Sequence, residues 1–312
     1  MSGWRAGLVA LALGSMVLAA GWFFNRDTGP PDPGSSTTIP VDADVTLACP
    51  SAYQLACDGL ASRLGAARAT YRPGTEIGEG TLVIAAVGDY PEGVTATPFA
   101  RSPIAIAIWQ ERSPALQRGC AIDISCLIDQ AGVSWSDLGG PASWGTVALG
   151  LADPTEGIAD LEAWRLFVEA GVAQSPGFGS NVRLRAPDEG QLTSDLILFP
   201  SRADAVVTSE VAIASQLENA RQRAGRLAVF YPDPTPFVVV GVYGEGRAAR
   251  NLAEELSGEE LQALLGSLGL RPLAGEAVDL PEGLGSPGGE LAAVDPAQRE
   301  TLVASWQEVV GG

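Results

Sequence analysis

Residues 144–171, which read WGTVALGLADPTEGIADLEAWRLFVEAG, decide the expected fold class. Thr146 to Leu151 are almost continuously apolar, which predicts a buried strand. Asp153 to Gly157 form a polar turn, and apolar residues from Ile158 to Ala170 then recur at helical spacing before Gly171, a candidate C-cap. A strand, a short turn and a helix in this order predict an α/β protein.

The turn between this strand and this helix is a candidate ligand site. Ligands of open α/β sheets sit at the carboxyl ends of strands, and the free N–H groups that begin a helix attract polar or anionic groups. The ordinary alternative is that the turn only joins two elements, with Thr155 or Asp153 as the N-cap. The residues alone leave both interpretations open.

Composition narrows the possible functions. The chain has 312 residues, 46% of them hydrophobic, which is enough for one large or two modest domains. Its net charge of −18 argues against nucleic acid as a partner. The sequence has no histidine, which excludes Ser-His-Asp and Cys-His catalysis. Adjacent carboxylates such as Glu254 and Glu255 favour solvated helix faces, so we expect no enzyme, no catalytic residue, no metal and no cofactor.

The four cysteines form two close pairs, Cys49 with Cys57 and Cys120 with Cys126. Pairing within each pair is favoured because the two pairs lie far apart in the sequence. The other pairings and four buried thiols remain open alternatives. Disulfides would place the chain in an oxidising compartment.

The N-terminal region predicts a membrane anchor. Residues 6–24 form a 19-residue run without charge, and a helix of that length spans about 28 Å, close to the thickness of a hydrocarbon core. We expect residues 1–25 to be an uncleaved signal anchor, a single-pass transmembrane helix in the cell membrane, with the main domain extracellular. Leu18 to Gly21 resemble a bacterial lipoprotein signal in which glycine replaces the lipidated cysteine. Residues 26–43, rich in Pro, Gly, Ser and Thr, predict a flexible linker.

Beyond the linker, strands alternate with helices, which predicts a mainly parallel sheet. Expected strands are 44–49, 67–71, 81–87, 102–109, 146–151, 181–185, 203–208, 226–231 and 237–243. Expected helices are 50–66, 158–170, 209–223, 247–256, 259–268 and 296–310.

Four segments, taken in order, resemble a known family. They are Ser102–Ala107, Trp135–Leu138 together with 144–157, Ala203–Glu210, and Tyr231–Pro272. In these segments the chain is similar to the type 2 periplasmic (extracellular) substrate-binding proteins, especially molybdate- and sulfate-binding-like members. It also resembles the solute-binding domains of actinobacterial von Willebrand A proteins.

The resemblance implies a periplasmic-binding-protein type 2 fold: two α/β lobes joined by a two-strand hinge, closing on a small solute. Lobe 1 would contain residues 44–103 plus 237–312, and lobe 2 residues 104–236. The implied function is that of a membrane-anchored extracytoplasmic solute-binding protein for ABC-type uptake, with an ABC permease as a candidate partner. A sensory or structural binding-fold domain without a transporter is the alternative.

The resemblance also implies ligand contacts at turns after strands and at helix N-termini. Carried over by position, these are Ser51, Asp89, Tyr90, Ser102, Asp153, Thr155, Glu156, Gly157, Thr208 and Ser209. Ser51 and Ser209 are equally good N-caps. Thr208 stands about where molybdate-binding members have a tyrosine. The acidic residues Glu156 and Asp233 near the expected cleft favour a cation or a neutral solute over a dianion.

Overall fold

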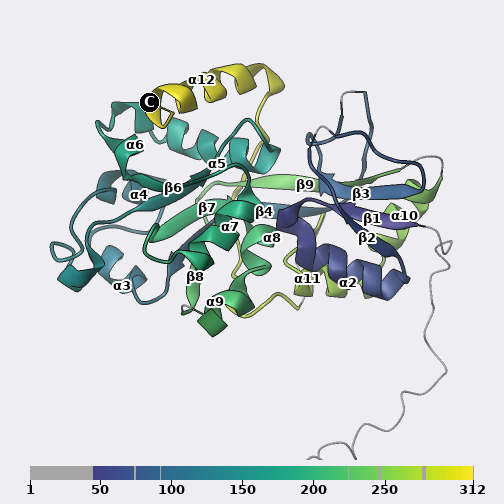
Figure 1. Cartoon of the computed structure of the whole chain (residues 1–312), viewed down its shortest axis with the longest axis horizontal. Coiled ribbons are helices and arrows are strands. Elements are labelled where there is room, and N and C mark those ends of the chain that lie inside the picture. The colour runs from purple at the N-terminus through teal and green to yellow at the C-terminus, as the bar shows by residue number, and fades with distance from the viewer. Residues whose placement is uncertain are drawn as a thin grey trace, which may run out of the picture. The chain divides into compact units, whose positions relative to one another are not determined.

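The computed structural model describes residues 45–73, 75–91, 93–223, 225–244, 247–275 and 279–311. Within these ranges the chain is a mixed α/β protein built on one sheet (Figure 1). The strands are β1 (Thr46–Cys49), β2 (Ala67–Thr70), β3 (Thr81–Ala86), β4 (Thr97–Trp109), β5 (Leu149–Ala152), β6 (Val182–Ala186), β7 (Ala205–Ser209), β8 (Leu227–Phe230), β9 (Thr235–Tyr243), β10 (Arg271–Pro272) and β11 (Glu290–Leu291).

Helices cover this sheet. The α-helices are α2 (Gln54–Leu64), α3 (Ser113–Leu116), α4 (Ile124–Gln130), α5 (Ile158–Glu169), α6 (Phe178–Asn181), α7 (Glu189–Leu198), α8 (Glu210–Ala214), α9 (Leu217–Arg223), α10 (Ala248–Leu256), α11 (Glu259–Ser267) and α12 (Arg299–Val309). Short 3₁₀ helices are η1 (Ser51–Tyr53), η2 (Ala142–Trp144), η3 (Val172–Gln174) and η4 (Pro296–Gln298). The helix expected over 209–223 is divided into α8 and α9, and α7 was not expected.

The main strand order is β2-β1-β3-β9-β4-β7-β5-β6. The flanks are parallel, as expected: β1 pairs with β2 and β3, and β5 pairs with β6 and β7. The expectation of a mainly parallel sheet is wrong at the centre, where β9 runs antiparallel to β3 and β4, and β4 antiparallel to β7. Strands β7, β8 and β9 all run antiparallel to β4, so β4 runs in the direction opposite to its partners on both sides.

Strand β4 is the longest, and it changes partners along its length. Thr97 to Pro103 pair with β9, whereas Ile104 to Ile108 pair with β7. It begins at Thr97 rather than at Ser102, where the sequence predicted it. One continuous strand therefore connects the part of the sheet that contains β1–β3 with the part that contains β5–β7.

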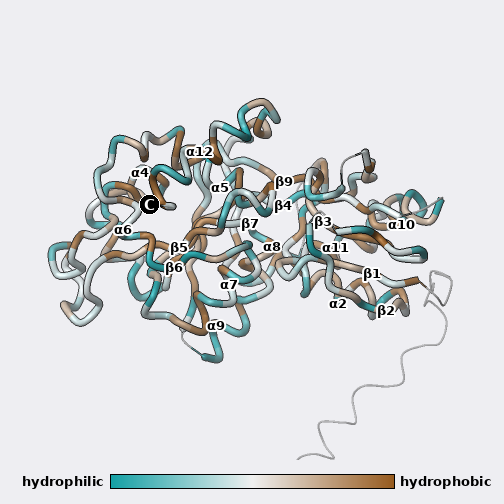
Figure 2. The backbone as a smooth tube through the Cα atoms, turned by 45° about the horizontal axis from the view of Figure 1, so that its top comes forward, coloured by the Kyte–Doolittle hydropathy of each residue, from teal (hydrophilic) through white to brown (hydrophobic). Residues whose placement is uncertain are grey.

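Two hydrophobic layers lie on opposite faces of β4. Ile104, Ile106 and Ile108 belong to the core that contains α5, while Ala105 and Ala107 belong to the core that contains α7. This alternation is the period of two expected for a strand covered on both faces. Figure 2 shows hydrophobic residues along the strands and polar residues in many of the outer turns.

The C-terminal helix α12 packs against α5 (Figure 1). The indole N–H of Trp164 donates to the carbonyl of Leu302 at 3.0 Å, and its ring meets Trp306 edge-on at 5.1 Å between centroids. Glu162 accepts a hydrogen bond from the backbone N–H of Val294 at 2.6 Å. The lobe boundaries stay a prediction, but these contacts attach the C-terminal segment to α5, within the range predicted as lobe 2.

Both local disulfides are present, so that prediction is confirmed. Cys49–Cys57 ties the end of β1 to α2, with a Cα–Cα distance of 6.2 Å. Cys120–Cys126 closes the loop that leads into α4, with a Cα–Cα distance of 5.7 Å. Each bond fixes the entry to a helix.

The predicted signal anchor at 1–25 and the linker at 26–43 lie outside the described residues. Within the ranges that the structure describes, no helix is both long and apolar enough to cross a membrane. The anchor therefore stays a prediction from the sequence.

Candidate functional site

The start of α5 is capped by a residue from another part of the sheet. Asp89, in the turn after β3, accepts a hydrogen bond from the backbone N–H of Ile158 at 2.8 Å. The N-cap position is Gly157, which has no side chain of its own to offer. Asp153 accepts hydrogen bonds from the N–H and hydroxyl of Thr155, at 2.9 and 2.8 Å, and so closes the turn. An N-cap at Thr155 or Asp153 is therefore wrong, because both side chains are used within the turn.

The start of α7 holds a buried carboxylate that the sequence pattern did not predict. Asp188 caps this helix by accepting from the N–H of Gln191 at 2.8 Å. The next residue, Glu189, turns inward and is 7% exposed. Its carboxylate accepts from the hydroxyl of Ser209 and, at 3.2 Å, from that of Thr208. The donors at the end of β7 are thus occupied by a group from the chain itself.

The turn after β1 touches the turn after β6. The hydroxyl of Ser51 donates to the carboxylate of Asp188 at 3.0 Å. A Cβ on Gly190 would lie 2.1 Å from Oγ of Ser51 and 2.5 Å from the backbone N of Ala52. Only glycine fits at this close approach, so residue 190 sets how near η1 and α7 come to each other.

Tyr53 carries an unpaired polar group at this contact. Its side chain is 1% exposed, and its hydroxyl has no hydrogen-bond partner among the described residues. Burial raises its pKa well above the usual value, and the negative charges of Glu189 and Asp89 raise it further. The hydroxyl therefore lies in a buried environment close to these carboxylates.

Asp89, Asp160 and Glu189 form what we call the carboxylate cluster. A Cβ on Gly157 would be 3.1 Å from one oxygen of Asp160 and 3.8 Å from one of Asp89, so both carboxylates border the start of α5. Burial raises the pKa of Asp89 to about 6 and that of Glu189 to about 7. Burial, followed by the charge of Glu189, raises the pKa of Asp160 well above its usual value.

The predicted residues differ in how they are placed. Ser51, Asp89, Gly157, Thr208 and Ser209 adjoin the carboxylate cluster or its immediate partners. Asp153 and Thr155 bond to each other, and Glu156 is exposed.

Ser102 and Tyr90 have their hydroxyl groups engaged with backbone. Ser102 accepts from the N–H of Val211 at 3.0 Å. Tyr90 accepts from the N–H of Ala85 at 3.1 Å and donates to the carbonyl of Gly241 at 2.7 Å. The ligand-contact role of all ten positions stays a prediction.

Tyr53, Asp160, Asp188 and Glu189 were not predicted. A signal for the last two exists in the sequence: Asp188 precedes Leu192 and Leu196 at helical spacing, which is typical of an N-capped amphipathic helix. Asp233, expected near the cleft, instead accepts from the N–H of Gly289 at 3.1 Å.

A second buried carboxylate provides a contrast. Glu210, at the start of α8, receives both a 2.7 Å and a 2.6 Å hydrogen bond from the guanidinium of Arg271, and also bonds to Tyr231. This two-point pairing balances its charge. Among the described residues, no arginine pairs with the carboxylate cluster in this way. The charge of Arg299 lowers the pKa of Asp89 against the larger effect of burial.

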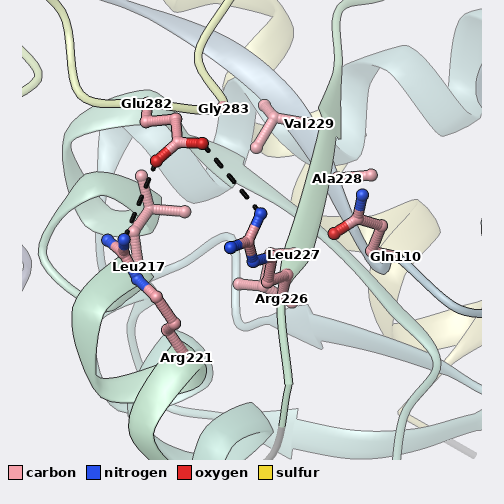
Figure 3. Close-up of a pocket in the computed structure, with 9 residues that line it drawn as sticks. All are labelled: Gln110, Leu217, Arg221, Arg226, Leu227, Ala228, Val229, Glu282 and Gly283. Atoms are coloured by element: carbon pink, nitrogen blue, oxygen red, sulfur yellow. Dashed lines mark ion pairs between the residues drawn. The ribbon is translucent and has the colours of Figure 1, made fainter.

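A surface pocket of about 300 Å³ lies elsewhere, beside β8 and α9 (Figure 3). Its charged residues are Arg221, Arg226 and Glu282, with Glu282 3.7 Å from one arginine and 4.0 Å from the other. One carboxylate there faces two arginines, and the pocket contains none of the predicted ligand contacts.

Comparison with known proteins gives a likeness in fold. No family model matches the sequence, and no curated protein matches it significantly. A protein from Trichodesmium, solved with iron and citrate, aligns at 9% identity and a TM-score of 0.52, covering 85% of this chain and 98% of its own. A protein from Bordetella parapertussis, assigned as an extracellular solute-binding protein, aligns at 11% identity with a TM-score of 0.51. The alignment covers 86% of this chain and 99% of that protein. The chain therefore shares the mixed α/β fold of these two proteins.

Proposed function

We propose that the chain captures a small solute between two halves of the molecule, at the carboxylate cluster. One observation carries this proposal: five turns, each at the carboxyl end of a strand, come together there. Four follow β1 (Ser51), β3 (Asp89), β5 (Gly157) and β6 (Asp188), and the fifth begins at Ser209, the last residue of β7. This is the position at which open α/β sheets bind ligands.

The connections between the halves support a closing movement. We assign one half to residues 45–103 with 237–275, and the other to 104–236 with 290–311. Strand β4 crosses at its change of partner after Pro103, and the start of β9 crosses back. The chain crosses a third time between residues 275 and 290, before β11 pairs with the start of β9. A solute that touches both halves would bind the closed state more tightly and shift the population toward it.

Binding rather than catalysis is the task that we propose, with ABC-type uptake as its purpose. The N-terminal run at 6–24 would hold the domain at the outer face of the cell membrane. The proposals of ABC-type uptake and of a membrane anchor both rest on the sequence. So does the resemblance to molybdate- and sulfate-binding-like substrate-binding proteins and to the solute-binding domains of von Willebrand A proteins. Two disulfides support an oxidising compartment.

Gly190 offers a test. In the full-length chain, Gly190→Ala should push η1 away from α7, because the new methyl group would overlap Ser51 and Ala52. Hydrogen–deuterium exchange should then increase at η1 and at the starts of α5 and α7 together. Gly78→Ala is the matched control, since its Cβ would meet nothing nearer than 3.7 Å.

The same pair of variants tests solute binding. A solute found by thermal-shift screening should protect the three segments in the wild-type chain and in Gly78→Ala. It should bind Gly190→Ala at least about tenfold more weakly, a difference of about 1.4 kcal/mol. Equal affinity for both variants, with protection elsewhere in the chain, would place the site outside these turns.

A further inference from the structure

We propose that the solute carries a protonated amine, and that the carboxylate cluster binds its ammonium group. This inference rests on the proposed function and names the chemical class of the ligand. It follows from three features of the described residues: donors that are already occupied, carboxylates without a matching cation, and one unpaired hydroxyl.

The groups that could hold an anion are already occupied. The N–H of Ile158 at the start of α5 donates to Asp89, and that of Gln191 at the start of α7 donates to Asp188. At the start of α8, the N–H of Val211 donates to the hydroxyl of Ser102. An oxyanion would have to displace the chain's own acceptors and would meet three carboxylates.

In the part of the chain that the structure describes, no arginine forms an ion pair with the carboxylates of the cluster. The main charge effects on Asp160 come from four other carboxylates, Glu189, Asp89, Asp188 and Asp153. Arg299 acts on Asp89 but donates its own hydrogen bond to the carbonyl of Thr155, at 3.4 Å. Buried carboxylates are costly unless they are paired or protonated, so a cation between the halves would relieve this cost.

Tyr53 adds an acceptor that fits an ammonium ion. Its buried hydroxyl oxygen has no partner among the described residues. An ammonium group has three donors, which can be shared between the tyrosine oxygen and the carboxylates of Asp89 and Asp160. In the ranges that the structure covers, no group of three or more His, Cys, Asp or Glu side chains is placed to hold a metal ion, which favours an amine over a metal.

The test is isothermal titration calorimetry of the full-length chain in detergent at pH 7.5. The probes are putrescine, spermidine and L-arginine as amines, sulfate and citrate as anions, and magnesium and calcium chloride as metals. We expect saturable binding of at least one amine. Asp160→Asn and Glu189→Gln should each weaken it about tenfold or more, which corresponds to about 1.4 kcal/mol. Glu254→Gln, an exposed carboxylate on α10, should leave it unchanged.

Near-ultraviolet circular dichroism checks that each variant is folded. Tyr53→Phe provides a second, milder change, which removes only the hydroxyl and should also weaken amine binding.

The outcomes separate the two proposals. Binding of sulfate, citrate or a metal ion that Gly190→Ala weakens, without binding of any amine, overturns the amine assignment and leaves the proposed function in place. Amine binding that survives both carboxylate substitutions also overturns the assignment. Failure of every probe to bind overturns the amine assignment; if no solute from a wider thermal-shift screen binds either, the proposed function fails with it.

Discussion

Glu189 links the protonation of one side chain to the stability of the fold. Its pKa rises from an ordinary 4.5 to about 7 because the side chain is buried, so the folded state favours its protonated form. The stability that this preference contributes is fully present below about pH 4.5 and is lost as the pH rises through about 7. Asp89 has the same effect: its pKa rises from 3.8 to about 6, so its contribution to stability is lost as the pH rises through about 6.

We therefore expect Glu189→Gln to flatten part of the pH dependence of unfolding. Between pH 5 and pH 8 the wild-type chain should lose on the order of 1–3 kcal/mol more free energy of unfolding than the variant. Urea denaturation followed by tryptophan fluorescence measures this difference. Glu254→Gln should follow the wild type, and a Glu189→Gln curve parallel to the wild type would contradict the assigned pKa shift.

Individual site residues were predictable where a turn follows a clear strand. Asp89 and Ser209 were singled out in this way, and the structure places both at the carboxylate cluster, while their contact with a ligand stays a prediction. Tyr53 was not predicted, because in the sequence it looks like any aromatic residue on the apolar side of a helix. What distinguishes it in the structure is its buried hydroxyl, which has no hydrogen-bond partner among the described residues. Tyr90 illustrates the converse: its hydroxyl bonds to the carbonyl of Gly241, 151 residues away, a contact that no local pattern reveals.

At the scale of elements, α7 is the main omission and the most consequential one. The strands before and after it are expected at 181–185 and 203–208, but Gly190 and Thr193 obscure the helical pattern of the segment between them. Helix propensity is low for both residues, and the packing of Leu192 and Leu196 outweighs it. Because α7 was not predicted, the sequence could not show that the carboxylate of Glu189 accepts hydrogen bonds from Thr208 and Ser209 at the end of β7.

The cap of α7 yields a prediction. Asp188→Ala removes the acceptor for both Gln191 and Ser51, so it should cost about 1–2 kcal/mol of stability. Ser51→Ala alone should cost less. In a double-mutant cycle the two changes should couple by about 0.5 kcal/mol or more, whereas additive effects would show that the contact between η1 and α7 contributes nothing.

The disulfides also act on single elements. Their sequence separations are 8 and 6, so each closes a short loop. Replacing either pair by alanines should lower the free energy of unfolding by about 2–3 kcal/mol. Denaturation of the two double variants against the oxidised wild type measures this, and an unchanged midpoint would mean that the bond adds no constraint.

At the scale of the whole molecule, the sequence predicted most strands but not their arrangement. The short βαβ units at the flanks follow from local alternation. The central position of β9 and the packing of α12 on α5 depend on contacts between distant segments, which apolar patterns alone do not specify.

The packing of α12 gives a prediction for the whole fold. Trp306→Ala should cost about 3–5 kcal/mol, because it leaves a cavity against Trp164 in the main core. Hydrogen exchange should increase along α5 as well as along α12. Gln307→Ala, on the exposed side of α12, should change stability by less than about 0.5 kcal/mol. Faster exchange confined to α12 would show that α5 does not depend on it.

The contact of Ser51 with Asp188 spans 137 residues, and that of Trp164 with Leu302 spans 138. During synthesis each early partner emerges from the ribosome long before the later one exists. Contacts between such distant residues slow folding, because closing the long loop between them costs conformational entropy before the contact can stabilise the chain. The turn that contains Ser51 is therefore made well before its partner at Asp188, and the apolar side of α5 around Trp164 stays open to chaperones until α12 has been released.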